Sequence, residues 1–407
     1  MSTAERLMRY CRYDTQSDPD SGTHPSSEKQ FVLAEQLVQE LKVLGLEDAA
    51  VDEHCYVYAH LPANTETSCP TIGLIAHMDT APDFSGANVK PRLIEHYDGE
   101  DIRLSDTMVT HVSAFPQLKQ FKGKSLIVTD GTTLLGADDK AGIAAIMEAM
   151  RYYHEHPEVM HGPIAVSFTP DEEIGEGSLF FDTAKMNADY AFTVDGDTIS
   201  EYSDETFNAA TVTVTIKGLA VHPGEAKNKM KNAALIAVEY AGLLPDWLTP
   251  SHTEGREGFI HLTSISGDIA EAELEYILRD HDYAKLESYY REMEQAAAFV
   301  KARYGEETIA LSFKESYRNM KDVLKDHPEV SELAERAIRA IGYEPRNVAV
   351  RGGTDGSHIS FMGLPCPNIG NGGGNFHGPY EYCVVEELED TVRLIRKMAE
   401  LTMEDAK

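Results

Sequence analysis

Short apolar segments alternate with longer stretches of helical spacing through the first half of this chain. Residues 71–76 (TIGLIA), 164–168 (IAVSF) and 190–194 (YAFTV) have the length and composition of buried strands. Residues 26–45, which begin at a serine suited to an N-cap, and residues 140–153 (KAGIAAIMEAMRYY) have the spacing of helices. Strands that alternate with helices predict an α/β unit with a mostly parallel sheet flanked by helices.

The pattern changes near residue 207. Residues 211–217 (TVTVTIK) alternate strictly, as a half-exposed antiparallel strand does. The elements expected after it are a helix at about 230–243, strands at about 258–266 and 271–279, a helix at about 283–303 and a strand at 308–316. The order β-α-β-β-α-β is the signature of a small ferredoxin-like α+β domain.

The alternation of helices and strands resumes after about residue 319. A chain of 407 residues is long enough for two or three domains. We therefore expect a discontinuous α/β domain made of residues 1–206 and 319–407, interrupted by an inserted α+β domain of residues 207–318.

The charge of the chain limits its partners. The net charge is −32, which repels both phosphate backbones and anionic lipid, so nucleic-acid and membrane partners are not expected. No window approaches the length of apolar chain that crosses a bilayer, and the start has no signal-peptide core. The five cysteines lack CxxC spacing, which favours free thiols in a reducing compartment. We expect a cytoplasmic protein.

Several common catalytic motifs are missing their central residues. Residues 131–138 (GTTLLGAD) have the GxxxxG of a P-loop, but Ala137 and Asp138 stand where Lys and Ser or Thr are needed. The sequence has no GxGxxG, no GxSxG and no HExxH. Nucleotide-binding, serine-hydrolase and zincin functions are therefore not supported.

Histidine and acidic residues follow the predicted strands where they end. The segments are IAHMDT (75–80), FTPDEEIG (168–175), TVDGD (193–197) and GGGNFHG (372–378), and LLGADDKAG (134–142) opens a helix with two aspartates. Taken singly, each is most simply a cap or a surface group. In parallel sheets, however, ligands bind beyond the carboxyl ends of the strands. Two histidines and at least four carboxylates at one such edge suit a two-metal hydrolytic site with nitrogen and oxygen ligands.

These motifs resemble those of the co-catalytic dizinc exopeptidases of the aminoacylase and carboxypeptidase superfamily. The matching segments are AHMDT, TLLGADDKAGIA, FTPDEEIG, TVDG, VHPG, RGGTDG and FMGLPCPN, and the resemblance covers essentially the whole chain. Mild departures are Met78, between His77 and Asp79, and Phe376, where the family often has Tyr. The resemblance implies a dizinc-exopeptidase catalytic domain with an inserted ferredoxin-like lid.

The resemblance also implies the metal ligands. His77, Asp138 and Asp195 would hold one zinc ion, and Asp138, Glu173 and His377 would hold the other, with Asp138 as the bridge. Two Zn²⁺ per chain are expected. Co²⁺ or Mn²⁺ can substitute, because the ligand set has no thiolate to confer selectivity.

Two further residues receive catalytic roles from the resemblance. Glu172 would be the general base, and Asp79 would orient His77. Because His77 and Asp79 are two residues apart at a strand end, they can share a face, and Asp79 can accept the proton on the ring nitrogen that does not bind metal. Asp139 is expected to support the site from behind or to cap the helix.

Three residues are expected to bind substrate. His222, in the VHPG motif, would donate to the oxyanion when the lid closes. Arg351 and Arg279 would bind a substrate carboxylate, which a guanidinium holds with two hydrogen bonds. Arg279 could equally form a salt bridge within the lid.

The resulting hypothesis is a metal-dependent aminopeptidase that releases the N-terminal residue from tripeptides, as the tripeptide aminopeptidases of this family do. The alternatives are a related dizinc dipeptidase, carboxypeptidase or N-acyl-amino-acid deacylase, and a metal- or solute-binding protein without activity. The expected partners are small peptides, and a homodimer is compatible with the resemblance because relatives often dimerise through the lid.

Overall fold

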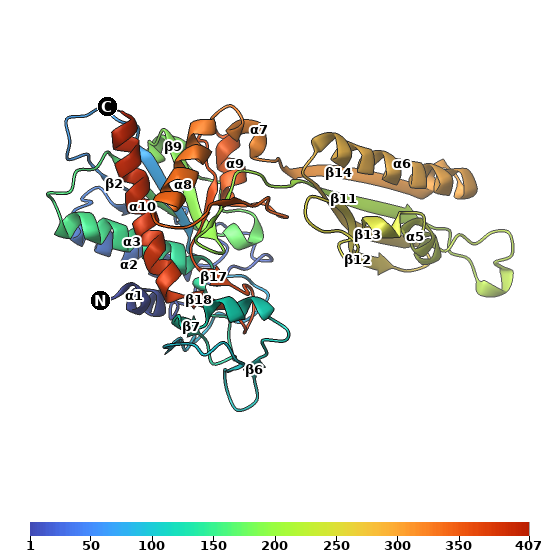
Figure 1. Ribbon diagram of the computed structural model, residues 1–407. Helices are drawn as coiled ribbons and strands as arrows, with labels where there is room; N and C mark the ends of the chain where they lie inside the picture. The colour runs from blue at the N-terminus through green and yellow to red at the C-terminus, as the bar shows by residue number, and fades with distance from the viewer. Residues whose placement is uncertain (407) are drawn as a thin grey trace. The chain divides into compact units, whose positions relative to one another are not determined.

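The chain divides into two compact units in the computed structural model, which describes residues 1–406 (Figure 1). The first unit contains Met1–Asp204, Val323–Val348 and the chain from Thr354 onward, and the second contains Glu205–Asp322 and Ala349–Gly353. The short segment Ala349–Gly353 joins the second unit because Val350 N–H donates to Glu205 O and Phe207 N–H donates to Gly352 O. The sequence analysis placed this segment, which includes the start of the RGGTDG motif, in the first domain because nothing in its pattern relates it to the inserted strands.

The first unit is built on an eight-stranded sheet whose centre is parallel. The strand order is β1 (Ala50–Val51), β2 (Val57–Leu61), β8 (Ile164–Thr169), β3 (Ile72–His77), β9 (Tyr190–Gly196), β16 (Asn368–Gly370), β10 (Glu201–Ser203) and β15 (Arg346–Asn347). The pairings β8–β3, β3–β9 and β9–β16 are parallel. Strands β3 and β8 are buried along their whole length, which explains their nearly continuous apolar sequences. The predicted α/β sheet is confirmed.

Helices cover this sheet. The longer ones are α1 (Thr3–Tyr10), α2 (Gln30–Val43), α3 (Ala137–Glu155), α8 (Pro328–Ala340) and α10 (Val385–Asp405), and the shorter ones are α4 (Thr183–Met186) and α9 (Asp355–Phe361). Helix α7 (Lys321–Leu324) lies where the chain passes from the second unit back to the first. Helix α3 contacts β3 and β9 and packs beside α1 and α10 (Figure 1), so it is buried along most of its length. Within residues 1–406, none of the helices combines the length and the apolar character that crossing a bilayer requires.

The predicted start of helix α2 is wrong by several residues. The serine at position 26 was expected to cap it, but the helix begins at Gln30. The Ser26 N–H and hydroxyl both donate to the buried carboxylate of Asp171, at 2.6 and 2.5 Å. Ser26 is therefore used to attach this segment to the loop that follows β8, and it does not cap α2.

A second small sheet in the first unit was not predicted. Its order is β17 (Gly373–Gly374), β18 (Tyr382–Val384), β7 (Leu126–Val128) and β4 (Arg92–Ile94), and a separate hairpin pairs β5 (Ile102–Arg103) with β6 (Val109–Thr110). Strands of two or three residues are too short to show an alternating pattern. The β17–β18 hairpin carries the loop that contains His377.

The second unit has the predicted β-α-β-β-α-β order. Its elements are β11 (Asn208–Lys217), α5 (Ala233–Ala241), β12 (Phe259–Gly267), β13 (Glu271–Asp280), α6 (Tyr283–Tyr304) and β14 (Ile309–Tyr317). The strands form an antiparallel sheet in the order β12-β13-β11-β14. Val212, Val214 and Ile216 of β11 are buried with apolar residues of α5 and α6, so the unit has its own core.

Candidate metal centre

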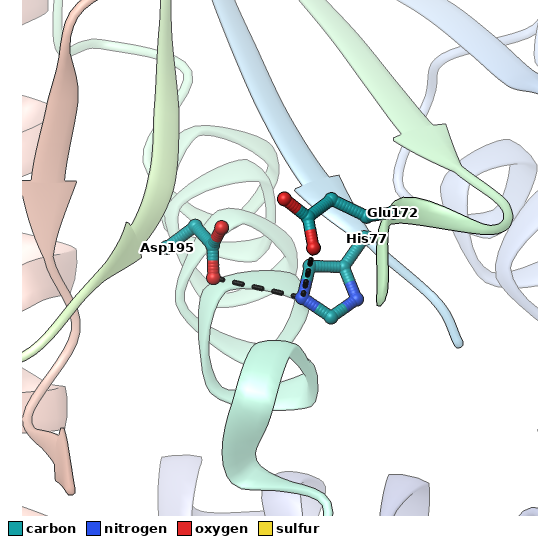
Figure 2. Close-up of side chains that lie close together, drawn as sticks. All are labelled: His77, Glu172 and Asp195. Atoms are coloured by element: carbon teal, nitrogen blue, oxygen red, sulfur yellow. Dashed lines mark ion pairs between the residues drawn. The ribbon is translucent and has the colours of Figure 1, made fainter. Parts of the chain in front are cut away.

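The carboxyl ends of three neighbouring strands bring histidine and acidic side chains together. His77 is the last residue of β3, and Asp195 lies near the end of β9. Glu172 and Glu173 form the 3₁₀ turn η2 (Glu172–Ile174) just after β8. Because β8, β3 and β9 are adjacent and parallel, these residues meet at one edge of the sheet. Figure 2 shows one ring nitrogen of His77 facing both Glu172 and Asp195.

The Nε2 atom of His77 faces three carboxylates. It lies 2.9 Å from Asp138 Oδ1, 3.6 Å from Asp195 Oδ1 and 4.0 Å from Glu172 Oε2 (Figure 2 shows the last two). Two groups of three residues could each hold a metal ion, since the ligand atoms within each group all lie within 4.8 Å of one another. They are His77–Glu172–Asp195 and His77–Asp138–Glu173. Glu172 is therefore close enough to contribute an oxygen to a metal ion, although it was predicted to be the general base.

Asp138 lies between two histidines. Its Oδ1 is 2.9 Å from His77 Nε2, and its Oδ2 is 3.4 Å from His377 Nε2. His377 Nε2 also lies 3.0 Å from Glu173 Oε2. The five residues predicted to hold metal thus lie in one cluster, and each oxygen of Asp138 is close to a different histidine. This is the arrangement that a bridging carboxylate needs.

The charges of this cluster favour a bound cation. Burial and the nearby Asp138 carboxylate raise the pKa of Asp195 to about 8 and that of Glu173 to about 7. Burial also raises the pKa of Glu172 well above its usual value. Hydrogen bonds to Asp138 and Glu173 raise the pKa of His377 to about 11. Carboxylates packed this closely are costly to ionise without a positive charge. Divalent cations with a preference for nitrogen and oxygen ligands fit this donor set.

Asp79 contacts both His77 and the turn that carries Glu172 and Glu173. His77 Nδ1 lies 3.2 Å from Asp79 O and 3.3 Å from Asp79 Oδ1, so the predicted role of Asp79 in orienting the ring stays a prediction that both the backbone and the carboxylate could serve. The same carboxylate accepts the backbone N–H groups of Glu172, at 3.0 Å, and of Glu173, at 3.2 Å. This second role was not predicted, because residues 93 positions apart carry no local signal of contact.

Other buried polar residues hold the segments that carry the cluster, and of these only Asp139 was expected to do so. Asp171 accepts from Ser26 and Gln30. Asn368 accepts the Asp195 N–H at 3.0 Å and donates to Asp195 O at 3.1 Å. Asp139 accepts the Gly142 N–H at 3.0 Å, which is consistent with a cap. In a chain with 68 acidic residues, nothing in the sequence separates such groups from surface carboxylates.

His222 and Arg279 lie in the second unit. His222 is exposed, and it precedes the turn η3 (Pro223–Glu225). Its Nδ1 accepts the Gly224 N–H at 3.2 Å, so the neutral ring carries its proton on Nε2. The Arg279 guanidinium donates to Leu278 O at 3.0 Å and lies 5.3 Å from the centre of the Tyr317 ring.

Arg351 also belongs to the second unit, where it holds a loop. Its guanidinium donates to Gly255 O at 3.0 Å, Glu257 O at 2.7 Å and Thr253 Oγ1 at 3.0 Å. It also lies 5.2 Å from the centre of the Phe207 ring. Binding of a substrate carboxylate by Arg351 stays a prediction. The contacts with the loop were not predicted, because no pattern in the sequence relates position 351 to residues 253–257.

Comparison with known proteins identifies the family. Residues 114–401 match the model for peptidase family M20/M25/M40. Peptidase T of Geobacillus sp. (strain WCH70) is 50% identical over 399 residues, which cover 98% of this chain and 97% of the relative. Peptidase T of Clostridium novyi (strain NT) is 48% identical over 402 residues, which cover 98% and 99%. The crystal structure of aminopeptidase PepT from Bacillus cereus has a TM-score of 0.76 at 25% identity and covers 98% of each chain. The chain therefore belongs to peptidase family M20/M25/M40 and, within it, to the peptidase T group.

Proposed function

We propose that this protein is a metal-dependent aminopeptidase that releases the N-terminal residue from tripeptides. The observation that carries the proposal is the position of Asp138, whose two oxygens face His77 and His377. A carboxylate in that position can hold two cations close together, as two-metal hydrolases do. The full-length similarity to proteins named peptidase T supports the choice of substrate.

The proposed ligands are those implied by the motifs. His77, Asp138 and Asp195 hold one Zn²⁺, and Asp138, Glu173 and His377 hold the other, with Co²⁺ or Mn²⁺ as substitutes. When bound, the pair of cations supplies Lewis-acid chemistry that polarises the scissile carbonyl and acidifies water.

Glu172 is the proposed general base. Its carboxylate lies at the edge of the ligand cluster, 4.0 Å from His77 Nε2. The Asp79 carboxylate accepts the backbone N–H groups of both Glu172 and Glu173 and so holds this part of the turn in place. With the backbone held, the two adjacent side chains can serve different roles. One can then bind metal while the other accepts a proton from the attacking water and delivers it to the leaving amine.

The proposed substrate contacts lie on the second unit. His222 has the tautomer needed to donate from Nε2 to an oxyanion. Arg279 is the first candidate for binding the C-terminal carboxylate of the peptide. Arg351 is the second, because its guanidinium also holds the loop of residues 253–257. A fixed carboxylate site would select peptide length, since an extended chain advances at most about 3.3–3.6 Å per residue.

The test uses four substrates with Zn²⁺ supplied. They are a tripeptide, the dipeptide lacking its last residue, the N-acetylated tripeptide and the tripeptide amide. We expect release of the N-terminal residue from the free tripeptide, and slower or no cleavage of the other three. Cleavage of the N-acetylated peptide would indicate a deacylase or carboxypeptidase, and preferred cleavage of the dipeptide would indicate a dipeptidase.

A further inference from the structure

Glu381 is a buried glutamate that lies in the loop between β17 and β18 and contacts the segment leading into α3. Its side chain is 1% exposed. Oε2 accepts the backbone N–H groups of Leu135, at 2.7 Å, and Gly136, at 2.8 Å. Oε1 accepts the N–H of Asp138 at 3.0 Å. One side chain therefore satisfies three backbone donors just before and at the proposed bridging residue.

The segment depends on an external acceptor. Gly136 has a left-handed backbone, and Asp138 has non-helical φ and ψ although it lies within the bounds of α3. The first N–H groups of a helix have no partner inside it. The Asp139 carboxylate accepts the Gly142 N–H, which leaves the N–H groups of Leu135, Gly136 and Asp138 in need of another acceptor. Buried N–H groups without an acceptor are strongly disfavoured. Glu381, from a distant part of the chain, supplies the acceptor oxygens that a capping residue usually supplies from the adjacent sequence.

The geometry requires a carboxylate at position 381. All three contacts use the side chain as an acceptor, and only an ionised carboxyl group has two oxygens and no donor. An amide of the same shape would point an NH₂ group at one or more of these N–H groups.

The same loop contributes directly to the metal cluster. His377 precedes Glu381 in the loop, and its Nε2 lies 3.4 Å from Asp138 Oδ2. The pairing of β17 with β18 closes this loop at Gly374 and Tyr382. This loop therefore contacts Asp138 at two points. Glu381 accepts the Asp138 backbone N–H, and His377 lies next to the Asp138 carboxylate.

We propose that Glu381 is a positioning residue for Asp138: it fixes the backbone of residues 135–138 so that the two Asp138 oxygens face His77 and His377. This inference rests on the proposed function, in that it takes Asp138 as the bridging ligand.

The test compares Glu381→Gln with a matched control, Glu148→Gln. Glu148 is a buried glutamate further along α3, and it pairs with Arg6 and Arg151 instead of with the site. Hydrogen exchange of peptides covering residues 134–139 is measured without and with Zn²⁺, and Zn²⁺ affinity is measured by competition with a chelator. For Glu381→Gln we expect exchange of these amides to rise about 10-fold or more and Zn²⁺ affinity to fall about 10–100-fold. The control should change neither, even if it lowers stability.

Glu381→Asp provides a second measurement if the Gln variant folds poorly. It keeps both acceptor oxygens on a shorter side chain, so it should recover part of the Zn²⁺ affinity that Glu381→Gln loses. Unchanged exchange in the Gln variant would overturn the proposal, and so would faster exchange with unchanged Zn²⁺ affinity. Failure of the proposed function is a different result: the wild-type protein would bind Zn²⁺ tightly and leave tripeptides intact.

Discussion

The carboxylate of Asp79 accepts the backbone N–H of Glu172 at 3.0 Å, although 93 positions separate the two residues. The same carboxylate faces His77 Nδ1. It therefore fixes the proposed base and a proposed metal ligand relative to each other. Small displacements of groups at a reaction centre slow catalysis strongly. We therefore expect loss of these hydrogen bonds to affect the rate of catalysis more than the stability of the fold.

Asp79→Asn should lower both kcat and Zn²⁺ affinity, each by about 10–100-fold, because the new NH₂ group must face either an N–H donor or the His77 ring. Steady-state kinetics and metal analysis of the purified variant measure the two effects. Asp48→Asn is a suitable control, since Asp48 forms an aspartate–histidine pair with His60 that is exposed and separate from the cluster. Equal effects of the two substitutions would reject the role of Asp79.

Glu172→Gln should lose about 10²–10⁴-fold in kcat and still bind two metal ions, because proton transfer and coordination are assigned to different residues. Glu173→Gln should instead lose metal affinity. The comparison is needed because the Glu172 carboxylate lies close enough to His77 and Asp195 to act as a ligand. If Glu172→Gln loses a metal ion and keeps its rate per bound pair, the two roles are reversed.

Long elements and strand-end motifs were predictable from sequence, and contacts between distant segments were not. The alternation of Val212, Val214 and Ile216 with polar residues predicted a strand of the inserted sheet. The prediction succeeded because these three side chains are buried on one face of β11. The clusters at the ends of β3, β8 and β9 could be predicted to converge because parallel neighbours end at one edge.

The errors have a common physical cause. Ser26 has the composition of a helix cap, but it donates to Asp171. Glu381 and Asn368 act through hydrogen bonds to segments far away in the chain. Tertiary contacts of this kind override local preference, and a single sequence contains no periodicity that reports them.

Removal of metal should abolish activity and also lower the melting temperature. Without a cation, the partly buried carboxylates of Asp195, Glu172 and Glu173 lie close together and oppose ionisation. Metal that binds only the folded state stabilises it by mass action. Dialysis against a chelator followed by calorimetry tests this, and Zn²⁺, Co²⁺ or Mn²⁺ should restore both properties. Full turnover by metal-free protein would exclude the two-metal mechanism.

Arg279→Ala and Arg351→Ala should have different effects. Arg351 donates to three acceptors of residues 253–257, so its removal should destabilise the second unit by about 1–3 kcal/mol, measured by urea unfolding. Arg279→Ala should mainly raise KM for tripeptides and reduce the preference for tripeptides over tripeptide amides, which lack the carboxylate. If Arg351→Ala alone removes that preference and leaves stability unchanged, Arg351 is the clamp.

His222→Ala should lower kcat by about 10²–10³-fold with little change in KM, because an oxyanion donor acts on charge that develops only in the transition state. The Gly224 N–H donates to Nδ1 and so keeps the proton on Nε2, which leaves that nitrogen as the donor. His252→Ala is the matched control, since His252 is an exposed histidine of the same unit with contacts to Thr249 and Ser251. A rise in KM with unchanged kcat for His222→Ala would mean that the ring binds the ground state of the substrate and not the oxyanion.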